Sequence, residues 1–165
     1  MNLIKSGGAI MSEKKDVRGL YFEEFESGFQ IKTSGRTITE ADVINFAGVS
    51  GDYNQIHTDA EYSRETPAGA RIAHGLLIMS IASGLVVLTG MMEGTVLVFR
   101  EIKNWKFIKP VYFNDTIHVD VKVSGTKLFK RLGGGLVETE LDVKNQNNET
   151  VMKGLWSSLI RCKPE

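Results

Sequence analysis

The chain is short of cysteine, of surplus charge and of unbroken apolar runs, and each shortage excludes a class of protein. Its single cysteine, Cys162, cannot form a disulfide within the chain, so a reducing compartment such as the cytoplasm is expected. The 20 basic and 20 acidic side chains cancel. A balanced charge gives no reason to expect nucleic acid or an anionic membrane surface as a partner.

The longest apolar stretch, residues 72–92, is interrupted by Ser80, Ser83 and Gly84. These interruptions favour a buried helix over a membrane span. The apolar content at the start of the chain is too broken for a signal peptide, so residues 1–18 are interpreted as a flexible tail. The remaining residues, 19–165, have the length and composition of a single globular domain.

Helix signals concentrate in the first half of the chain. Thr39 is a good N-cap, and Gly48 or Gly51 ends the predicted helix. A strand is expected before it, at about residues 30–34. Residues 52–70 are loop-like, with room for one short helical turn. The apolar helix then runs from about residue 75 to 88 and should be buried on most faces.

The second half of the chain has the period of β-structure. Strands are predicted at residues 95–107, 116–123, 136–143 and 151–160, with a turn at 145–148. Short connections predict a meander of antiparallel strands. The predicted fold class is therefore α+β: an antiparallel sheet wrapped around one central apolar helix, which resembles the hot-dog fold. Single hot-dog domains usually dimerise, which shields a sheet edge.

Candidate chemistry lies where the loop meets that helix. Asp52 and His57 are five positions apart on a segment too irregular to be one helical face, and Gly75 stands at the start of the apolar helix. A carboxylate and an imidazole can hold a water molecule and move its proton. The free N–H of a glycine at a helix start can meet charge that develops on a carbonyl oxygen, and glycine permits close approach of a substrate.

The motif Asp52-x-Asn54-x-x-His57, followed by Ile-Ala-His-Gly at residues 72–75, resembles the signature of the MaoC-like dehydratases. That family includes the R-specific enoyl-CoA hydratases. The resemblance extends over residues 19–161. It implies reversible hydration of trans-2-enoyl thioesters to R-3-hydroxyacyl thioesters.

Carried over by position, the resemblance also implies a role for each motif residue. Asp52 and His57 would be the catalytic pair, and the Gly75 N–H would bind the thioester oxygen. Ser83 would orient the pair from the helix, and Asn54 would shape the loop. The implied partner is a small-molecule acyl thioester, carried by coenzyme A or by acyl carrier protein, with no further cofactor. The implied assembly is a homodimer or a dimer of dimers.

The other candidate residues have plainer interpretations. His74 is interpreted as positioning the turn before Gly75, and His118 as a strand residue facing away from its apolar neighbours. Three scattered histidines and one cysteine match no metal-ligand spacing, so no metal site is expected. Two alternatives to hydration remain: a hot-dog acyl thioesterase, and a non-catalytic subunit that binds acyl thioesters.

Overall fold

The computed structural model describes residues 18–164. The predicted N-terminal tail lies outside the described residues except for Arg18, whose guanidinium forms an ion pair with Glu93 at 2.9 Å. Within the described part of the chain, no helix is long and apolar enough to cross a membrane.

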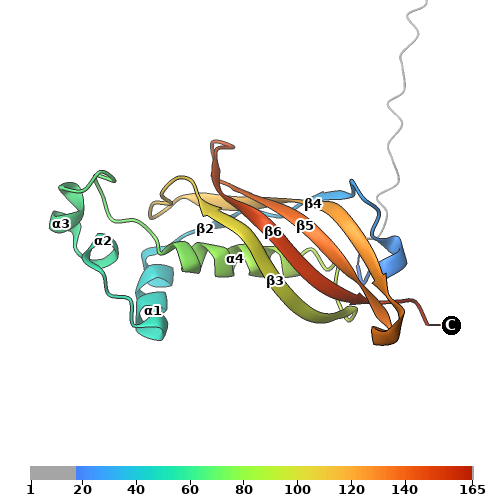
Figure 1. Cartoon of the computed structure of the whole chain (residues 1–165). Coiled ribbons are helices and arrows are strands. Elements are labelled where there is room, and N and C mark those ends of the chain that lie inside the picture. Colours follow the sequence, from blue (N-terminus) through green and yellow to red (C-terminus); the bar gives the residue numbers. More distant parts are fainter. Residues whose placement is uncertain (1–17, 165) are drawn as a thin grey trace, which may run out of the picture.

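One antiparallel sheet dominates the structure (Figure 1). Its strand order is β1-β4-β5-β6-β3, and the short strand β2 pairs with β4 beside β1. The predicted meander is wrong at one step, because residues 108–115 carry the chain from β3 across to β4 at the other side of the sheet. The strands are β1 (Gln30–Lys32), β2 (Arg36–Thr37), β3 (Val96–Phe107), β4 (Thr116–Phe129), β5 (Gly134–Lys144) and β6 (Thr150–Arg161).

The sheet curls around a single helix, α4 (Gly75–Val87), as the sequence predicts for the hot-dog fold (Figure 1). Alternation along β4 places its valines and isoleucine inward, and the middle of α4 packs against them. One face of α4 remains uncovered in the single chain, since Leu76, Ser80, Gly84 and Val87 are exposed. The buried core includes Ile78, Ile81, Ala82, Leu85, Ile117, Val119, Val121, Val123, Leu141 and Val143.

Three shorter helices lie together beyond the end of the sheet, where α4 begins (Figure 1). They are α1 (Glu40–Ser50), α2 (Gln55–Thr58) and α3 (Ala60–Arg64), so the segment predicted as mostly loop contains two short helices. Two 3-10 turns, η1 (Phe22–Glu24) and η2 (Lys130–Leu132), complete the set. This arrangement holds residues 52–74 over the N-terminus of α4.

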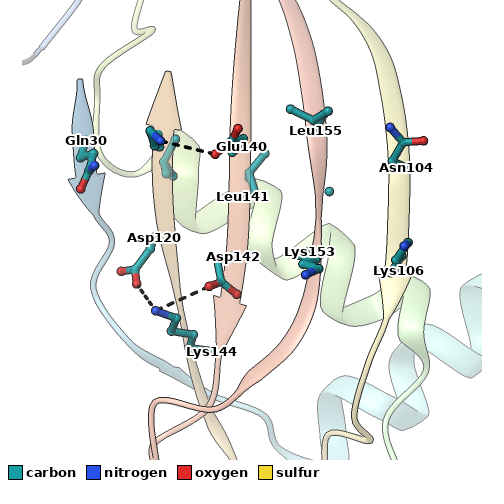
Figure 2. A pocket seen from close by; sticks show the side chains of 13 residues that line it. Gln30, Asn104, Lys106, Asp120, Glu140, Leu141, Asp142, Lys144, Lys153 and Leu155 are labelled. Atoms are coloured by element: carbon teal, nitrogen blue, oxygen red, sulfur yellow. Dashed lines mark hydrogen bonds and ion pairs between the residues drawn. The ribbon is translucent and has the colours of Figure 1, made fainter. Parts of the chain in front are cut away.

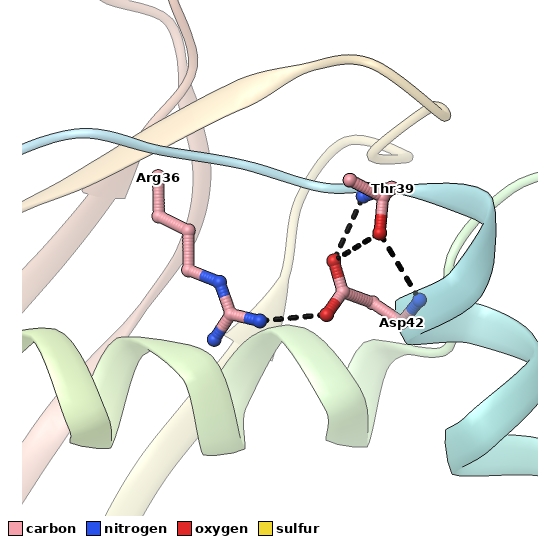
Figure 3. A network of polar contacts seen from close by, with 3 residues as sticks. All are labelled: Arg36, Thr39 and Asp42. Atoms are coloured by element: carbon pink, nitrogen blue, oxygen red, sulfur yellow. Dashed lines mark hydrogen bonds and ion pairs between the residues drawn. The ribbon is translucent and has the colours of Figure 1, made fainter.

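The predicted N-cap at Thr39 is confirmed (Figure 3). The Asp42 N–H donates to the Thr39 hydroxyl at 3.2 Å, and the Thr39 N–H donates to the Asp42 carboxylate at 2.8 Å. Arg36 from β2 donates to the same carboxylate at 2.6 Å. At the other end of α1, Gly51 adopts the left-handed conformation, with φ at 77°, and turns the chain towards Asp52.

The outer face of the sheet carries a shallow hollow of about 530 Å³, lined mainly by charged side chains (Figure 2). Those charges are paired: Lys144 donates to Asp120 on the neighbouring strand β4 at 2.8 Å, and it lies 3.5 Å from Asp142 on its own strand β5. Lys122 and Glu140 are 3.9 Å apart. α4 covers the opposite face of the sheet (Figure 2), and the hollow shares no lining residue with the cavity beside His57.

The Thr39–Asp42 cap gives a first test of the fold. Burial alone would raise the pKa of Asp42, but hydrogen bonds from Thr39 and the charge of Arg36 outweigh it and lower the pKa. Asp42→Ala should therefore reduce the free energy of unfolding by about 1–2 kcal/mol in denaturant titrations. The loss should persist above about pH 4 and shrink in stronger acid, where the carboxyl is protonated.

The matched control is Glu61→Ala on α3, which removes an exposed carboxylate paired only with Arg64. Its effect should stay within about 0.5 kcal/mol. If Asp42→Ala and the unaltered protein unfold at the same denaturant concentration, the Thr39–Asp42 cap does not stabilise the fold.

Candidate functional site

The loop after α1 brings the Asp52 carboxylate to the site. Its backbone N–H donates to the Ser50 hydroxyl at 3.2 Å, and one carboxylate oxygen accepts the Asn54 N–H at 3.2 Å. Asn54 in turn caps α2, because its side-chain oxygen accepts the Ile56 N–H at 3.2 Å. Asn54 thus fixes the turn between the two predicted catalytic residues, while the Asp52 side chain stays exposed in the single chain.

His57 lies on α2 and is 6% exposed. Its Nδ1 is 2.7 Å from the backbone oxygen of Ile72. A carbonyl oxygen can only accept, so Nδ1 carries the proton and Nε2 keeps a lone pair. Burial is the main cause that lowers the pKa of His57, opposed by the Ile72 hydrogen bond and the Asp52 charge. The neutral ring is therefore the favoured form near pH 7.

His74 lies between the two halves of the site. It is the residue before α4, and its Nε2 donates to the backbone oxygen of Asp52 at 2.8 Å. Its ring stacks on His57 with centroids 3.7 Å apart and also contacts Phe46 at 5.1 Å. His74 therefore positions Asp52 relative to His57. This role is additional to the one that the sequence suggested, which was to position the turn before Gly75.

These contacts bring together side chains that are distant in sequence. One polar atom each from Asp52, His57 and His74 lies within 4.8 Å of the others. The predicted catalytic pair is thus assembled in space. The sequence led to the interpretation of His74 as a residue that positions the turn before Gly75. The Ile72 carbonyl could not have been found, because a backbone oxygen leaves no signal in the sequence.

A cavity of about 870 Å³ opens beside His57 and Gly75. Its walls are largely apolar and come from the loop before α4, the end of β3 and the following segment. The lining residues include Ile56, Ile72, Leu76, Phe107, Ile108, Val111 and Met152.

Gly75 is the first residue of α4, so its N–H has no acceptor within the helix and lies at the positive end of the helix dipole. A Cβ at this position would lie 2.6 Å from the Phe107 ring. Glycine therefore keeps the backbone N–H accessible from the cavity, which a side chain would obstruct. The arrangement matches the anion-binding end of a helix.

Two other predicted residues lie elsewhere. Ser83 follows Gly75 by eight residues on α4, which is about 12 Å along a helix. It lines a second cavity, of about 560 Å³, with Trp156 and Met92 instead of contacting Asp52 or His57. The structure therefore does not bring Ser83 to the pair within one chain. His118 lies on β4, where burial is the main cause that lowers its pKa.

The fold and the site together define a hot-dog domain with a carboxylate–imidazole pair beside an apolar cavity. The profile of the MaoC like domain matches residues 25–145, and the chain belongs to this family of hydratases and dehydratases.

Individual relatives agree with this assignment. The chain is 41% identical to Protein MaoC of Klebsiella aerogenes over 60% of its own length, but it spans only 29% of that protein. It is 34% identical to an (R)-specific enoyl-CoA hydratase of Rhodospirillum rubrum, over 64% of this chain and 70% of the relative. A solved structure, the monoamine oxidase regulatory protein of Archaeoglobus, superposes with a TM-score of 0.83 at 37% identity, covering 89% and 97% of the two chains.

The environment of His57 predicts its titration. The pKa of His57, followed by NMR of the imidazole ring, should fall below the usual histidine value of about 6.5. Asp52→Asn should lower that pKa further, because the Asp52 charge favours the protonated ring. Since the unfolded chain takes up the proton more readily, His57 should also make the fold less stable as the pH drops below about 6.5.

Glu61→Gln supplies a control, since it neutralises an exposed carboxylate on α3 that pairs with Arg64. A His57 pKa that is normal, or that rises in Asp52→Asn, would refute the described environment.

Proposed function

We propose that the protein hydrates trans-2-enoyl thioesters to R-3-hydroxyacyl thioesters, and catalyses the reverse dehydration. The observation that carries the proposal is the free Nε2 of a buried, neutral His57 at the same cavity as the Gly75 N–H. Membership of the MaoC-like family supports the reaction class, and the Rhodospirillum rubrum relative is named for it.

His57 and Asp52 together handle the water molecule. Water donates one hydrogen bond to His57 Nε2 and one to the Asp52 carboxylate, which has an oxygen within 4.8 Å of a His57 ring nitrogen. As the water oxygen bonds to Cβ of the substrate, its proton passes to His57 Nε2. The proton then passes to Cα, so that the elements of one water are added across the double bond. The lowered pKa of His57 suits this exchange, because the ring starts neutral and gives the proton up readily.

Gly75 and the cavity hold the substrate. The Gly75 N–H donates to the thioester oxygen, where negative charge develops as water attacks Cβ. Apolar walls around the acyl chain exclude bulk water and strengthen that hydrogen bond. The carrier, either coenzyme A or acyl carrier protein, stays attached to the acyl group and extends to solvent through the open side of the cavity.

The decisive measurement is the loss of enoyl absorbance when the protein is added to crotonyl-CoA and longer enoyl-CoAs. His57→Ala and Asp52→Asn should each lower kcat/KM by about 10²–10⁴-fold, because each removes a group that acts on the water proton. His118→Asn, which alters a histidine on β4, should keep the activity of the unaltered protein.

Product analysis separates the alternatives in the same assay. Release of free thiol with the double bond intact would show a thioesterase and overturn the proposal. Binding of enoyl-CoA without turnover by the unaltered protein would show a non-catalytic acyl-thioester-binding subunit instead.

We also propose that two copies of the chain pair through β3. This strand bonds to β6 on one side, and among residues 18–164 no strand pairs with its other side. Apolar side chains along it are exposed, which makes an unpaired edge prone to association. A two-fold axis would join β3 to its copy in antiparallel fashion and continue the sheet. The exposed apolar residues of β3 are Val96, Leu97, Val98, Phe99, Ile102 and Phe107.

Sedimentation or light scattering should give twice the chain mass for the unaltered protein. Val98→Lys should shift the population towards monomer, because it places a charge in the proposed interface. Val49→Lys is the matched control: Val49 is equally apolar and 87% exposed, but it lies on α1. A monomeric unaltered protein, or a dimer weakened only by Val49→Lys, would refute pairing through β3.

A further inference from the structure

Asp52, His57 and His74 form a cluster that the proton-transfer scheme does not fully use. They come from the loop after α1, from α2 and from the residue before α4. One potential metal-ligand atom of each lies within 4.8 Å of the other two. Their separations in sequence match no metal-binding motif, so only the fold brings this donor set together.

The hydrogen bonds of the two histidines leave one ring nitrogen free on each. His57 Nδ1 donates to the Ile72 oxygen, and His74 Nε2 donates to the Asp52 oxygen. Lone pairs therefore remain on His57 Nε2 and His74 Nδ1. Metal-ligating histidines are held in this way: one nitrogen binds the ion, and the other N–H donates to a backbone carbonyl or a carboxylate.

The second observation is an unsatisfied acceptor. His74 is 2% exposed, and its Nδ1 has no hydrogen-bond partner among the described residues. Buried polar atoms in folded proteins nearly always have a partner, so the lack of one for this nitrogen indicates that a ligand binds there. The proposed hydration gives it no task, because the water proton passes to His57.

We propose that Asp52, His57 and His74 bind a divalent transition-metal ion of the Zn²⁺ class. Two imidazoles and one carboxylate are a donor set that Zn²⁺ accepts, with a fourth position left for water. Nitrogen donors disfavour Mg²⁺ and Ca²⁺, which prefer oxygen ligands. To reach bonds of about 2 Å, the stacked rings must tilt and the three donor atoms must draw together. The exposed Asp52 side chain keeps one oxygen on the Asn54 N–H, so its other carboxylate oxygen is the one available to the ion.

Occupancy by the metal has a consequence for catalysis, and this part of the inference depends on the proposed function. The ion would take the lone pair of His57 Nε2 and one oxygen of Asp52, which are the two groups that hold the reacting water. The metal therefore acts as a reversible inhibitor that competes for the acid–base pair.

Binding is tested without any activity assay. Co²⁺ added to the metal-free full-length chain should give the visible absorption bands of a low-coordinate site at one ion per chain, and Zn²⁺ should bleach them. Asp52→Asn and His74→Asn should each weaken binding by at least about tenfold. His118→Asn should match the unaltered protein. Because Asp52 is exposed, Asp52→Asn should keep the fold, which circular dichroism checks even if His74→Asn unfolds.

Two outcomes would overturn the site: no Co²⁺ absorption bands at millimolar metal, or unchanged affinity for Co²⁺ in folded Asp52→Asn.

The inhibition is tested separately with crotonyl-CoA. Zn²⁺ at its measured dissociation constant should halve the hydration rate, and a chelator should restore it. Full activity at saturating Zn²⁺ would overturn the competition. A chain inactive on every enoyl thioester would sink the proposed function, while the Co²⁺ titration would still decide the site.

Discussion

Two hydrogen bonds from imidazole rings to backbone carbonyls organise the whole site. The Ile72 oxygen fixes the proton of His57 on Nδ1, and the Asp52 oxygen fixes the proton of His74 on Nε2. Without the first bond, the nitrogen that faces the cavity could carry a proton and could not accept one from water. Without the second, the loop that bears the Asp52 carboxylate would lose its link to the residue before α4.

The hot-dog architecture explains why these bonds can form. The sheet curls along one side of α4, and α1–α3 gather at the N-terminal end of that helix (Figure 1). The loop can therefore place a carboxylate, an imidazole and a free backbone N–H around one cavity. The proposed hydration uses this geometry, and the three donor atoms presented together are the basis of the proposed metal site.

The agreement between the sequence-based predictions and the structure varies along the chain. The cap at Thr39, the end of α1 at Gly51, the start of α4 at Gly75 and the β-strands of the second half follow from local signals. The meander fails at residues 108–115, because strand pairing is a non-local choice that periodicity does not encode. The role expected for Ser83 came from the family resemblance, and α4 carries this residue about 12 Å along the helix axis from Gly75.

The sequence by itself determined the longer helices and strands, the α+β class and the residue types that can do acid–base chemistry, since these depend on composition, period and short motifs. Tertiary structure alone decided that the His74 ring packs against the His57 ring. It also decided that, among residues 18–164, the buried Nδ1 of His74 has no hydrogen-bond partner and no strand pairs with the outer edge of β3. The physical reason is that ring tautomers, cavities and strand neighbours depend on atoms far apart in the chain, and such atoms meet only after folding.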